Sequence, residues 1–489
     1  METQHNKLAN DKMKTQQLTV LPDEKVSFGQ SALLGLQHVM AMDVYVVPFL
    51  IAMLIGFQSG QSSALIQSTF IAVGIATIIQ THFCMKLPIA QGPSYVPIGA
   101  IVGIYAASGS GDLGWSTVLG ASLVGAILVI ILGFTGVFNK IVKTFIPPIV
   151  GGTIIFVVGL SLMPVGLSDN IYNAAGASIN QNIYLALTSA IVLILCVMLG
   201  SVFNKKGRVF RIASVIIALI VGCIAANIMG VLNLSAVSQA KWFSMPQIPF
   251  ADFSFTFNFS AIITMVIIYI VLMAETTGTW FAVSNVIDKP LTDKQINRGV
   301  IGEGIGCFIA SLLGSTPVTG YSTNAGVISI TGIASRRVFI AAGFWFILFG
   351  FSGKLAALIS AIPSAVIGGV FVIVCGIIAI SGLQVMKNES IGEKEMYVIA
   401  VPVILTLALT LLPKDFLYSL PTTVQYLFGS PIATAAIVAI LLNKVLPLLK
   451  SMRNLLSLRD CAFFLLGIFF RNFCPFFFHF VILEQKSRD

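Results

Sequence analysis

GSTPVTGYSTNAGVISITG, residues 314–332, is the stretch on which the interpretation of the whole chain depends. It lies in an apolar region, yet Pro317, Gly320 and Gly326 interrupt it, and hydroxyl and amide side chains fill it. Irregular backbone at membrane depth is tolerated only where protein buries it or where it lines a cavity. We therefore expect a broken membrane crossing beside a solute site. The alternative is a loop between two spans.

The composition indicates a polytopic membrane protein. Of 489 residues, 57% are apolar and only 10% are charged, which a soluble core does not require. The net charge of +9 would suggest nucleic acid as the partner of a soluble protein, but here Lys and Arg sit in short segments between apolar runs. The seven cysteines include no C-x-x-C spacing, so neither a disulfide framework nor a zinc site is indicated.

A membrane span needs about 20 mostly apolar residues, and this length predicts fourteen segments. They lie at 31–54, 63–80, 88–106, 115–137, 144–164, 183–203, 210–232, 259–284, 296–313, 316–333, 337–352, 362–383, 396–412 and 425–443. With the N-terminus inside, the outer loops hold only Lys241, Lys354 and Lys414, whereas the other inter-span lysines and arginines are cytoplasmic. This alternation requires the tenth segment to cross, because Arg336 and Arg337 must lie inside.

The two ends of the chain differ from this plan. Residues 1–30 are polar and lack the short apolar core of a signal peptide, so we expect a cytoplasmic tail. Residues 446–489 are rich in Phe and include Arg471 and His479. They are interpreted as an additional hydrophobic segment, an interfacial helix, or sequence without selected function such as an altered reading frame.

Two motifs recur at an offset of roughly 220 residues. IPPIVGG at 146–152 returns as IPSAVIGG at 362–369, and QGPSYVPIGAIVGI at 91–104 resembles TGYSTNAGVISITGI at 319–333. Both pairs relate segment n to segment n+7, and an odd offset gives the halves opposite orientations in the membrane. The predicted fold is therefore an all-α polytopic membrane protein with 14 transmembrane segments as a 7+7 inverted repeat. A matched pair of broken segments, here the third and tenth, indicates a transporter site.

Ionisable residues inside spans are costly and are functional candidates. Glu275 lies in the eighth segment, Glu303 in the ninth between two glycines, and His38 and Asp43 in the first. Removal from water favours the protonated form of a carboxyl group, which lets it take up and release a proton during transport. The alternatives are a helix end in water for Glu275 and hydrogen-bonded structural contacts for Glu303 and His38. Asp43 is interpreted as structural.

No enzyme motif is present: the sequence contains neither G-x-x-x-x-G-K-[ST] nor H-E-x-x-H, and no Ser/His/Asp set that the spans would bring together. Without a nucleotide-binding motif, uphill transport has to use an ion gradient. One proton crossing about 100 mV supplies roughly 2.3 kcal/mol, enough to drive accumulation of a neutral solute.

STNAGVISITG at 322–332 resembles the signature [Q/E/P]-N-x-G-x-x-x-x-T-[R/K/G] of the nucleobase/ascorbate transporter family, the second nucleobase-cation symporter family. Asn324, Gly326, Thr331 and Gly332 fit this pattern. The resemblance extends to a Gln-His pair in the first span, here ending in His38, and to acidic residues in spans eight and nine. It covers residues from about 30 to 445, so the tail lies outside it.

The resemblance implies a core domain and a gate domain, with short strands in segments 3 and 10 that face one another and bind a base between them. The core would comprise residues 31–138 (spans 1–4) and 259–352 (spans 8–11), and the gate 139–258 (spans 5–7) and 353–445 (spans 12–14). The expected cell-membrane protein has both ends of its fourteen-span body in the cytoplasm. The family also suggests a homodimer through the gate domains, no cofactor beyond a proton as coupling ion, and no nucleic-acid partner.

The resemblance also implies roles for individual residues. Glu275 would accept a hydrogen bond from the N–H edge of the base, and Tyr95 would stack on its ring. Backbone groups around Tyr321, Ser322 and Thr323 would help to hold the base, and Asn324 would organise the motif. Glu303 and His38 would assist proton coupling and shape the site. A planar heterocycle with fixed donors suits one carboxylate, backbone amides and an aromatic face.

The sequence departs from the family at Thr323, where Gln or Glu is common. A hydroxyl is shorter and has one donor, so the contact with the base would be lost or replaced by water. The surroundings of the motif resemble bacterial purine permeases, which favours xanthine or uric acid carried with protons by elevator-like movement. The alternatives are uracil, an anion transporter or channel of the same broad fold, and a membrane enzyme acting on lipid. Glu275 opposes an anion site, and no catalytic cluster supports the enzyme.

Overall fold

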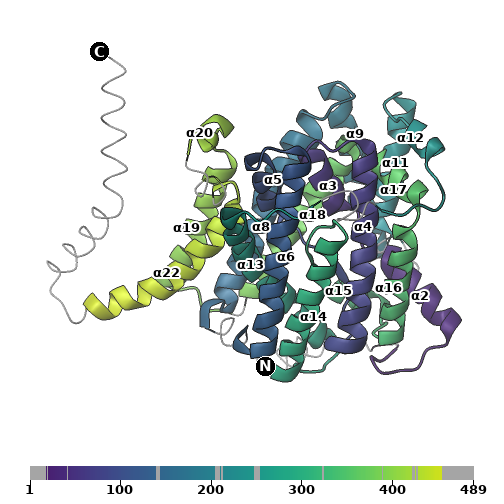
Figure 1. Ribbon diagram of the computed structural model, residues 1–489. Coiled ribbons are helices and arrows are strands. Elements are labelled where there is room, and N and C mark those ends of the chain that lie inside the picture. Colours follow the sequence, from purple (N-terminus) through teal and green to yellow (C-terminus); the bar gives the residue numbers. More distant parts are fainter. Residues whose placement is uncertain are drawn as a thin grey trace, which may run out of the picture.

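The computed structural model describes residues 18, 20–40, 42–138, 144–203, 210, 213–246, 254–321, 324–387, 389–420, 425 and 428–453. Its first half contains α2 (Phe28–Met40), α3 (Val46–Leu54), α4 (Ser59–Ile78), η1 (Ile79–Cys84), β1 (Gln91–Pro93), α5 (Ile98–Ala107), α6 (Gly111–Thr135), α8 (Pro148–Pro164), η2 (Val165–Tyr172), α9 (Ile179–Val202), α11 (Ser214–Ile228) and α12 (Ser235–Gln239). The second half contains α13 (Phe259–Val286), α14 (Asp293–Leu312), β2 (Val318–Gly320), α15 (Asn324–Thr331), α16 (Arg336–Gly350), α17 (Gly353–Ser360), α18 (Ser364–Met386), α19 (Glu393–Thr410), α20 (Lys414–Ser419) and α22 (Pro431–Arg453). The helices form one bundle, from which α22 projects (Figure 1).

Six of the described helical stretches are long and apolar enough to cross a membrane alone. They are Ser59–Cys84, Gly111–Thr135, Pro148–Tyr172, Ile179–Gly200, Phe259–Val286 and Ser364–Met386. The helices α16 and α17 are bent by 78° relative to each other and would make a seventh if they form one broken span. Each of the fourteen predicted segments contains at least one of the described helices. The chain is therefore a multi-pass helical membrane protein, while the count of fourteen spans stays a prediction.

Three of the predicted segments are interrupted where polar residues, Pro or Gly occur. The first segment, which the sequence predicts as one unbroken span, divides into α2 and α3 around Asp43. The third divides into β1 and α5, with Pro93 and Pro97 beside the break, and the tenth divides into β2 and α15 just after Pro317. Proline removes a backbone donor and disfavours helix before it, so the breaks in the third and tenth segments follow from the sequence.

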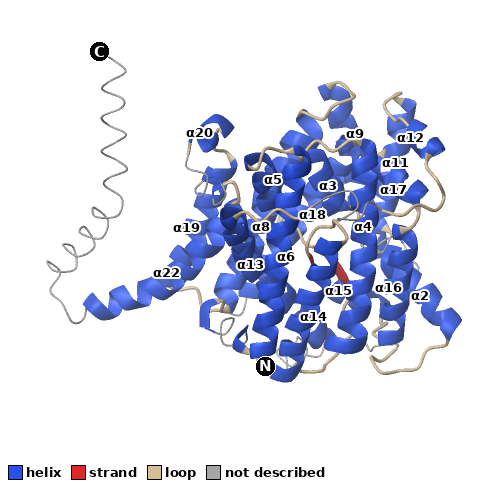
Figure 2. Ribbon diagram, viewed as in Figure 1, coloured by secondary structure: helices blue, strands red, loops and turns tan. Residues whose placement is uncertain are grey.

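The strands β1 and β2 form an antiparallel pair inside the helical bundle (Figure 2). Gln91 pairs with Gly320, Gly92 with Thr319, and Pro93 with Val318, and all six residues are buried. Backbone bonds extend the pair at both ends, from the Tyr321 amide to the Ala90 carbonyl and from the Ser94 amide to the Pro317 carbonyl, each 3.0 Å long. The prediction that short strands in segments 3 and 10 face one another is confirmed.

The repeated IPP/IPS motifs begin two helices, α8 and α18, that pack tightly and run antiparallel. Gly152 of α8 meets Gly382 and Met386 near the end of α18, whereas Gly159 meets Cys375 and Ala379 nearer its middle. A Cβ atom at Gly159 would stand only 2.5 Å from the Cys375 carbonyl oxygen, so the contact requires glycine. Antiparallel packing of repeat-related segments, here and in the strand pair, is the arrangement that an inverted repeat requires.

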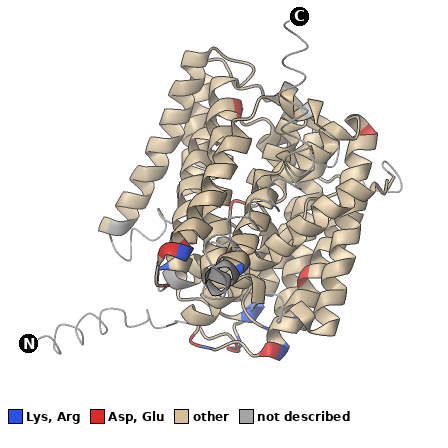
Figure 3. Cartoon of the chain, turned by 90° about the vertical axis from the view of Figure 1, so that its left-hand side faces the viewer, with Lys and Arg blue, Asp and Glu red and all other residues tan. Residues whose placement is uncertain are grey.

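The end of the predicted N-terminal tail is ordered against the rest of the protein. Val20 forms a parallel bridge with Ile333, and the Asp23 carboxylate binds Arg336 at 2.7 Å and Lys289 at 3.5 Å. These contacts bring the N-terminal segment and the loops after α13 and α15 to one end of the bundle, as the charge alternation predicts. The Lys and Arg residues coloured in Figure 3 lie mainly at that end.

Candidate functional site

Glu303 lies in the middle of α14 and joins the two strands. Its side chain is 1% exposed. Oε2 accepts hydrogen bonds from the side-chain amides of Gln80 and Gln91, each 3.1 Å long, while Oε1 accepts one of 2.9 Å from the Gly320 backbone amide. One carboxylate thus bonds to the first residue of β1 and to the last residue of β2. This geometry agrees with the alternative that Glu303 makes a hydrogen-bonded structural contact.

Gln80 reaches Glu303 from η1, where α4 widens from an α-helix into a π-helix. Its side-chain amide also donates to the Gly299 carbonyl at 3.0 Å, so a single amide group bridges two turns of α14. The opposing surface of α14 at Gly302 carries no side chain, and a Cβ atom there would collide with Gln80. Such π-bulges occur frequently at functional sites.

Two threonines of α13 and a cysteine of α14 satisfy the backbone of β2. The Thr276 hydroxyl accepts a hydrogen bond from the Gly320 amide at 2.9 Å, and the Thr279 hydroxyl donates to the Gly320 carbonyl at 3.0 Å. The Cys307 thiol donates to the Val318 carbonyl at 3.0 Å. Side chains from neighbouring helices therefore replace the partners that a two-stranded sheet lacks, as non-helical backbone at membrane depth requires.

Glu275 lies one residue before Thr276 and faces the other end of β1. The Ser94 hydroxyl donates to Glu275 Oε2 at 2.7 Å, and the Glu275 side chain is only half-buried. Because α13 continues to Val286, Glu275 is inside the helix and not at its end, which removes the helix-end alternative. A partly exposed carboxylate with one described donor has acceptor capacity left for a ligand.

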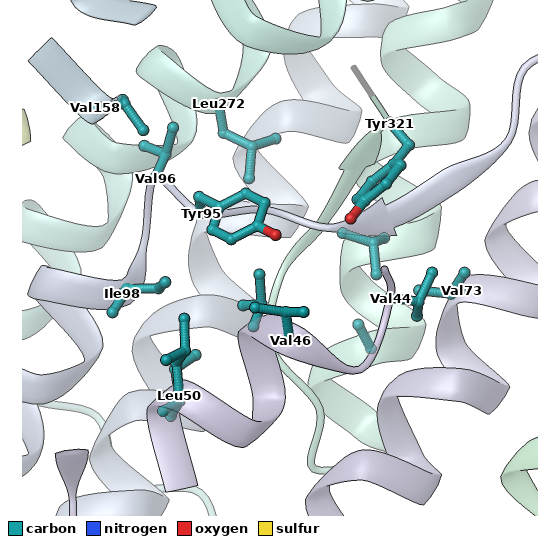
Figure 4. Close-up of a cluster of buried hydrophobic side chains, with 14 of the residues drawn as sticks. Val44, Val46, Leu50, Val73, Tyr95, Val96, Ile98, Val158, Leu272 and Tyr321 are labelled. Atoms are coloured by element: carbon teal, nitrogen blue, oxygen red, sulfur yellow. The ribbon is translucent and has the colours of Figure 1, made fainter. Parts of the chain in front are cut away.

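Tyr95 follows β1 and Tyr321 follows β2, and both side chains are buried in the cluster drawn in Figure 4. The Tyr95 ring stacks on Phe371 of α18, with the ring centroids 6.1 Å apart and the planes inclined by 22°. The Tyr321 ring lies over Gly92, where a Cβ atom would overlap it. Each of the two strands is therefore followed by a tyrosine with a buried ring.

Asn324 connects the two broken segments. Its side-chain amide donates to the Pro88 carbonyl at 2.9 Å, and its backbone amide donates to the Tyr321 carbonyl at 3.0 Å. As the first residue of α15 it fixes the start of that half-helix against the segment that leads into β1. This arrangement agrees with the organising role that the family resemblance implies.

The remaining predicted site residues are not brought to the strands in the described part of the chain. His38 Nδ1 donates to the Leu34 carbonyl of its own helix at 3.0 Å, and its ring packs edge-on against Phe339 of α16. Ser322 and Thr323 lie outside the described residues. Among the described residues, no group of three His, Cys, Asp or Glu side chains could hold a metal ion.

Several residues at this site were not selected from the sequence, namely Gln80, Gln91, Ser94, Thr276 and Thr279. Intramembrane glutamines are a usable signal, because an unpaired amide in lipid is costly. The serine and threonines carry a weaker signal, since their hydroxyls often bond to their own helix.

Comparison with known proteins identifies the relatives of this chain. The model of a permease family matches residues 29–415. The xanthine permease of Bacillus subtilis (strain 168) is 29% identical over 444 residues, which cover 89% of this chain and 98% of that protein. The uracil permease of Bacillus caldolyticus is 31% identical over 431 residues, covering 87% and 94%. The transmembrane domain of a cyanobacterium bicarbonate transporter, BicA, aligns with a TM-score of 0.53 at 15% identity over 86% of this chain and 100% of that chain, a likeness of fold alone.

Proposed function

Because the chain belongs to the nucleobase/ascorbate transporter family, whose members are permeases and not enzymes, we propose that it imports an oxidised purine, xanthine or uric acid. The named relatives carry xanthine in one case and uracil in the other, so a nucleobase is the substrate class that they support. The residues around the signature motif at 322–332 resemble those of bacterial purine permeases, which favours a purine over a pyrimidine.

The contact between Ser94 and Glu275 is the observation that carries this function. It puts a half-buried carboxylate beside the end of β1, where the third segment is broken. A carboxylate that accepts hydrogen bonds from ring N–H groups, next to an aromatic face, matches a neutral planar heterocycle. In this scheme Glu275 binds the N–H edge and Tyr95 stacks on the base.

The tenth segment supplies the rest of the proposed site. Backbone groups of Tyr321, Ser322 and Thr323 contact the base, and Asn324 keeps α15 in register with the third segment. Glu303 fixes the strand pair and takes part in proton coupling. The contacts of His38 with Leu34 and Phe339 support a role in the shape of the core.

Transport is proposed to occur by proton symport with elevator-type alternating access. A core of residues 31–138 and 259–352 would move against a gate of residues 139–258 and 353–445, with both ends of the fourteen-span body cytoplasmic and the gate domains forming a homodimer. Packing supports this division, because α4 packs on α14 and α16 within the core, and α18 packs on α8 and α9 within the gate. The Tyr95–Phe371 contact then lies between core and gate.

One other substrate has specific support, because the uracil permease relative favours a pyrimidine. An anion transporter of the same broad fold is the alternative from a different class. An anion site needs a cation or a helix N-terminus without a nearby carboxylate, and the position of Glu275 at the strand end opposes this.

A competition panel tests the function. Cells that lack their own nucleobase uptake and express this chain should accumulate labelled xanthine, and unlabelled xanthine and uric acid should compete more strongly than uracil or bicarbonate. If uracil competes and the purines do not, the substrate is a pyrimidine and not a purine. If the cells take up bicarbonate alone, the substrate is an anion and not a nucleobase. A protonophore should abolish accumulation, whereas uptake that persists on a sodium gradient alone would overturn proton coupling.

A further inference from the structure

Asp43 joins the first segment to both strands. It lies in the break between α2 and α3, and its side chain is 7% exposed. The Tyr95 hydroxyl donates to Oδ2 at 3.0 Å, and the Tyr321 hydroxyl donates to Oδ1 at 2.5 Å. Each oxygen of one carboxylate thus holds one of the two rings that follow the strands.

This arrangement requires a reason, because a carboxylate is an expensive side chain at this depth. Hydrogen bonds from two phenol groups offset only part of the cost of removing the charge from water. Apolar residues in place of Asp43 and both tyrosines would fill the same space at lower cost, because the two rings lie in a cluster of buried apolar side chains that includes Val44, Val46 and Val73 (Figure 4). The acid is therefore better explained by what it does to the tyrosines than by the stability of the fold.

The two tyrosine rings have little freedom while Asp43 holds them. Figure 4 shows their hydroxyl groups directed toward each other from opposite sides. The face of the Tyr95 ring packs on Phe371, and the Tyr321 ring rests on Gly92. Ser94, which bonds to Glu275, is the residue immediately before Tyr95, so a shift of that ring also disturbs the contact at the carboxylate.

We propose that Asp43 is a positioning residue for the substrate, which fixes the Tyr95 and Tyr321 rings by accepting a hydrogen bond from each hydroxyl. This inference rests on the proposed transport of a nucleobase and deepens it. Fixing the rings before the base arrives removes an ordering cost from binding, so the carboxylate raises affinity without contacting the base itself.

Uptake kinetics of labelled xanthine test the proposal. Asp43→Ala should raise KM about tenfold, because the Tyr95 and Tyr321 rings are no longer fixed before the base binds. Vmax should change by less than about twofold, because the helices of the core and gate domains are unaltered. Asp43→Asn should raise KM only about threefold, since the amide can still accept from one hydroxyl and donate to the other. Asp112→Asn, an exposed acid in the first turn of α6, is the matched control and should leave both constants unchanged.

A double-mutant cycle separates positioning from other roles. In a Tyr95→Phe/Tyr321→Phe background there are no hydroxyls to hold, so Asp43→Ala should add less than about a twofold change in KM. The same tenfold rise in both backgrounds would mean that Asp43 acts independently of the tyrosines and would overturn the proposal. A loss of transporter from the membrane in both backgrounds, with KM unchanged, would make Asp43 purely structural and would also overturn it.

Wild-type uptake distinguishes the two levels of inference. If the wild-type chain takes up xanthine and Asp43→Asn has a normal KM, the role of Asp43 is wrong and the transport function stands. If the wild-type chain takes up no nucleobase, both are wrong. Should Asp43→Ala fail to reach the membrane, the KM of Asp43→Asn decides alone.

Discussion

The two carboxylates beside the strand pair have opposite surroundings. Glu303 is fully buried and accepts three described hydrogen bonds, from Gln80, Gln91 and the Gly320 amide. Glu275, on the neighbouring helix, is half-buried and accepts one, from Ser94. Donors arranged from several elements fix a group in place, whereas unused acceptor capacity leaves a group available to a ligand.

This difference supports different roles for two acidic residues in adjacent spans. In the proposed function, Glu303 stabilises the unusual backbone of the site, and Glu275 changes its hydrogen-bond partner when a base binds. Proton coupling through either residue requires its hydrogen-bond partners to be rearranged, which is easier for the one with fewer partners.

The largest expected effect is that of Glu275→Gln. The amide keeps the shape but loses the charge-assisted hydrogen bonds to the N–H edge of the base, so uptake of labelled xanthine should fall about 100-fold at unchanged abundance in the membrane. Glu389→Gln, an exposed acid between α18 and α19, is the control and should transport normally. Near-normal uptake by Glu275→Gln would show that Glu275 does not bind the substrate, and the proposed difference in role between Glu275 and Glu303 would then be wrong.

Glu303→Gln should lower the stability of the protein and also weaken proton-coupled accumulation, because an amide cannot take up and release a proton. The glutamine side chain keeps one acceptor oxygen, but its NH2 group is a donor that faces other donors, the side-chain amides of Gln80 and Gln91. The free energy of unfolding should therefore fall by about 3 kcal/mol. The apparent melting temperature of the purified protein in detergent measures this, with Glu275→Gln as the comparison. Equal melting temperatures for the two variants would show that the donors around Glu303 do not stabilise the fold.

Gly92→Ala tests the close approach between the strands. A Cβ atom at this position overlaps the Tyr321 ring, so the ring or the strand has to shift, at a cost of about 2 kcal/mol. Uptake should fall about tenfold through a higher KM. Gly103→Ala, later in the same segment, is the control because its Cβ atom would make ordinary contact at 3.7 Å with the Gly429 carbonyl. Equal effects of the two substitutions would show that the Tyr321 position is not critical.

The sequence predicted the features that depend on local chemistry. Pro93, Pro97 and Pro317 interrupt apolar runs, so the breaks in the third and tenth segments could be anticipated. The facing strands in these segments were implied by the family resemblance. The intramembrane acids Glu275 and Glu303 stood out because charges are rare in spans.

The sequence did not predict which groups meet across the bundle. Gln80 and Glu303 are far apart in the chain, and only the packing of α4 on α14 makes them neighbours. Asp43 was interpreted as structural because nothing local indicates that two tyrosines converge on it. Long-range partners depend on helix orientation and register, which hydrophobic patterns of uniformly apolar spans do not encode.

The smallest expected effect, and the sharpest test of the contrast, is that of Ser94→Ala. If Glu275 is poised because Ser94 alone among the described residues donates to it, loss of that hydroxyl leaves the carboxylate correctly placed along α13 but free to rotate. KM for xanthine should then rise about fivefold, because a single hydrogen bond is worth about 1 kcal/mol. The melting temperature should fall only slightly, because the Ser94 hydroxyl also accepts a hydrogen bond of 3.1 Å from the Val96 amide. Ser63→Ala removes a hydroxyl that bonds to Ser360, away from the strands, and should alter neither quantity. A fall in melting temperature with a normal KM would place Ser94 with the stabilising donors around Glu303, and Glu275 would then be as much a part of the scaffold as its neighbour.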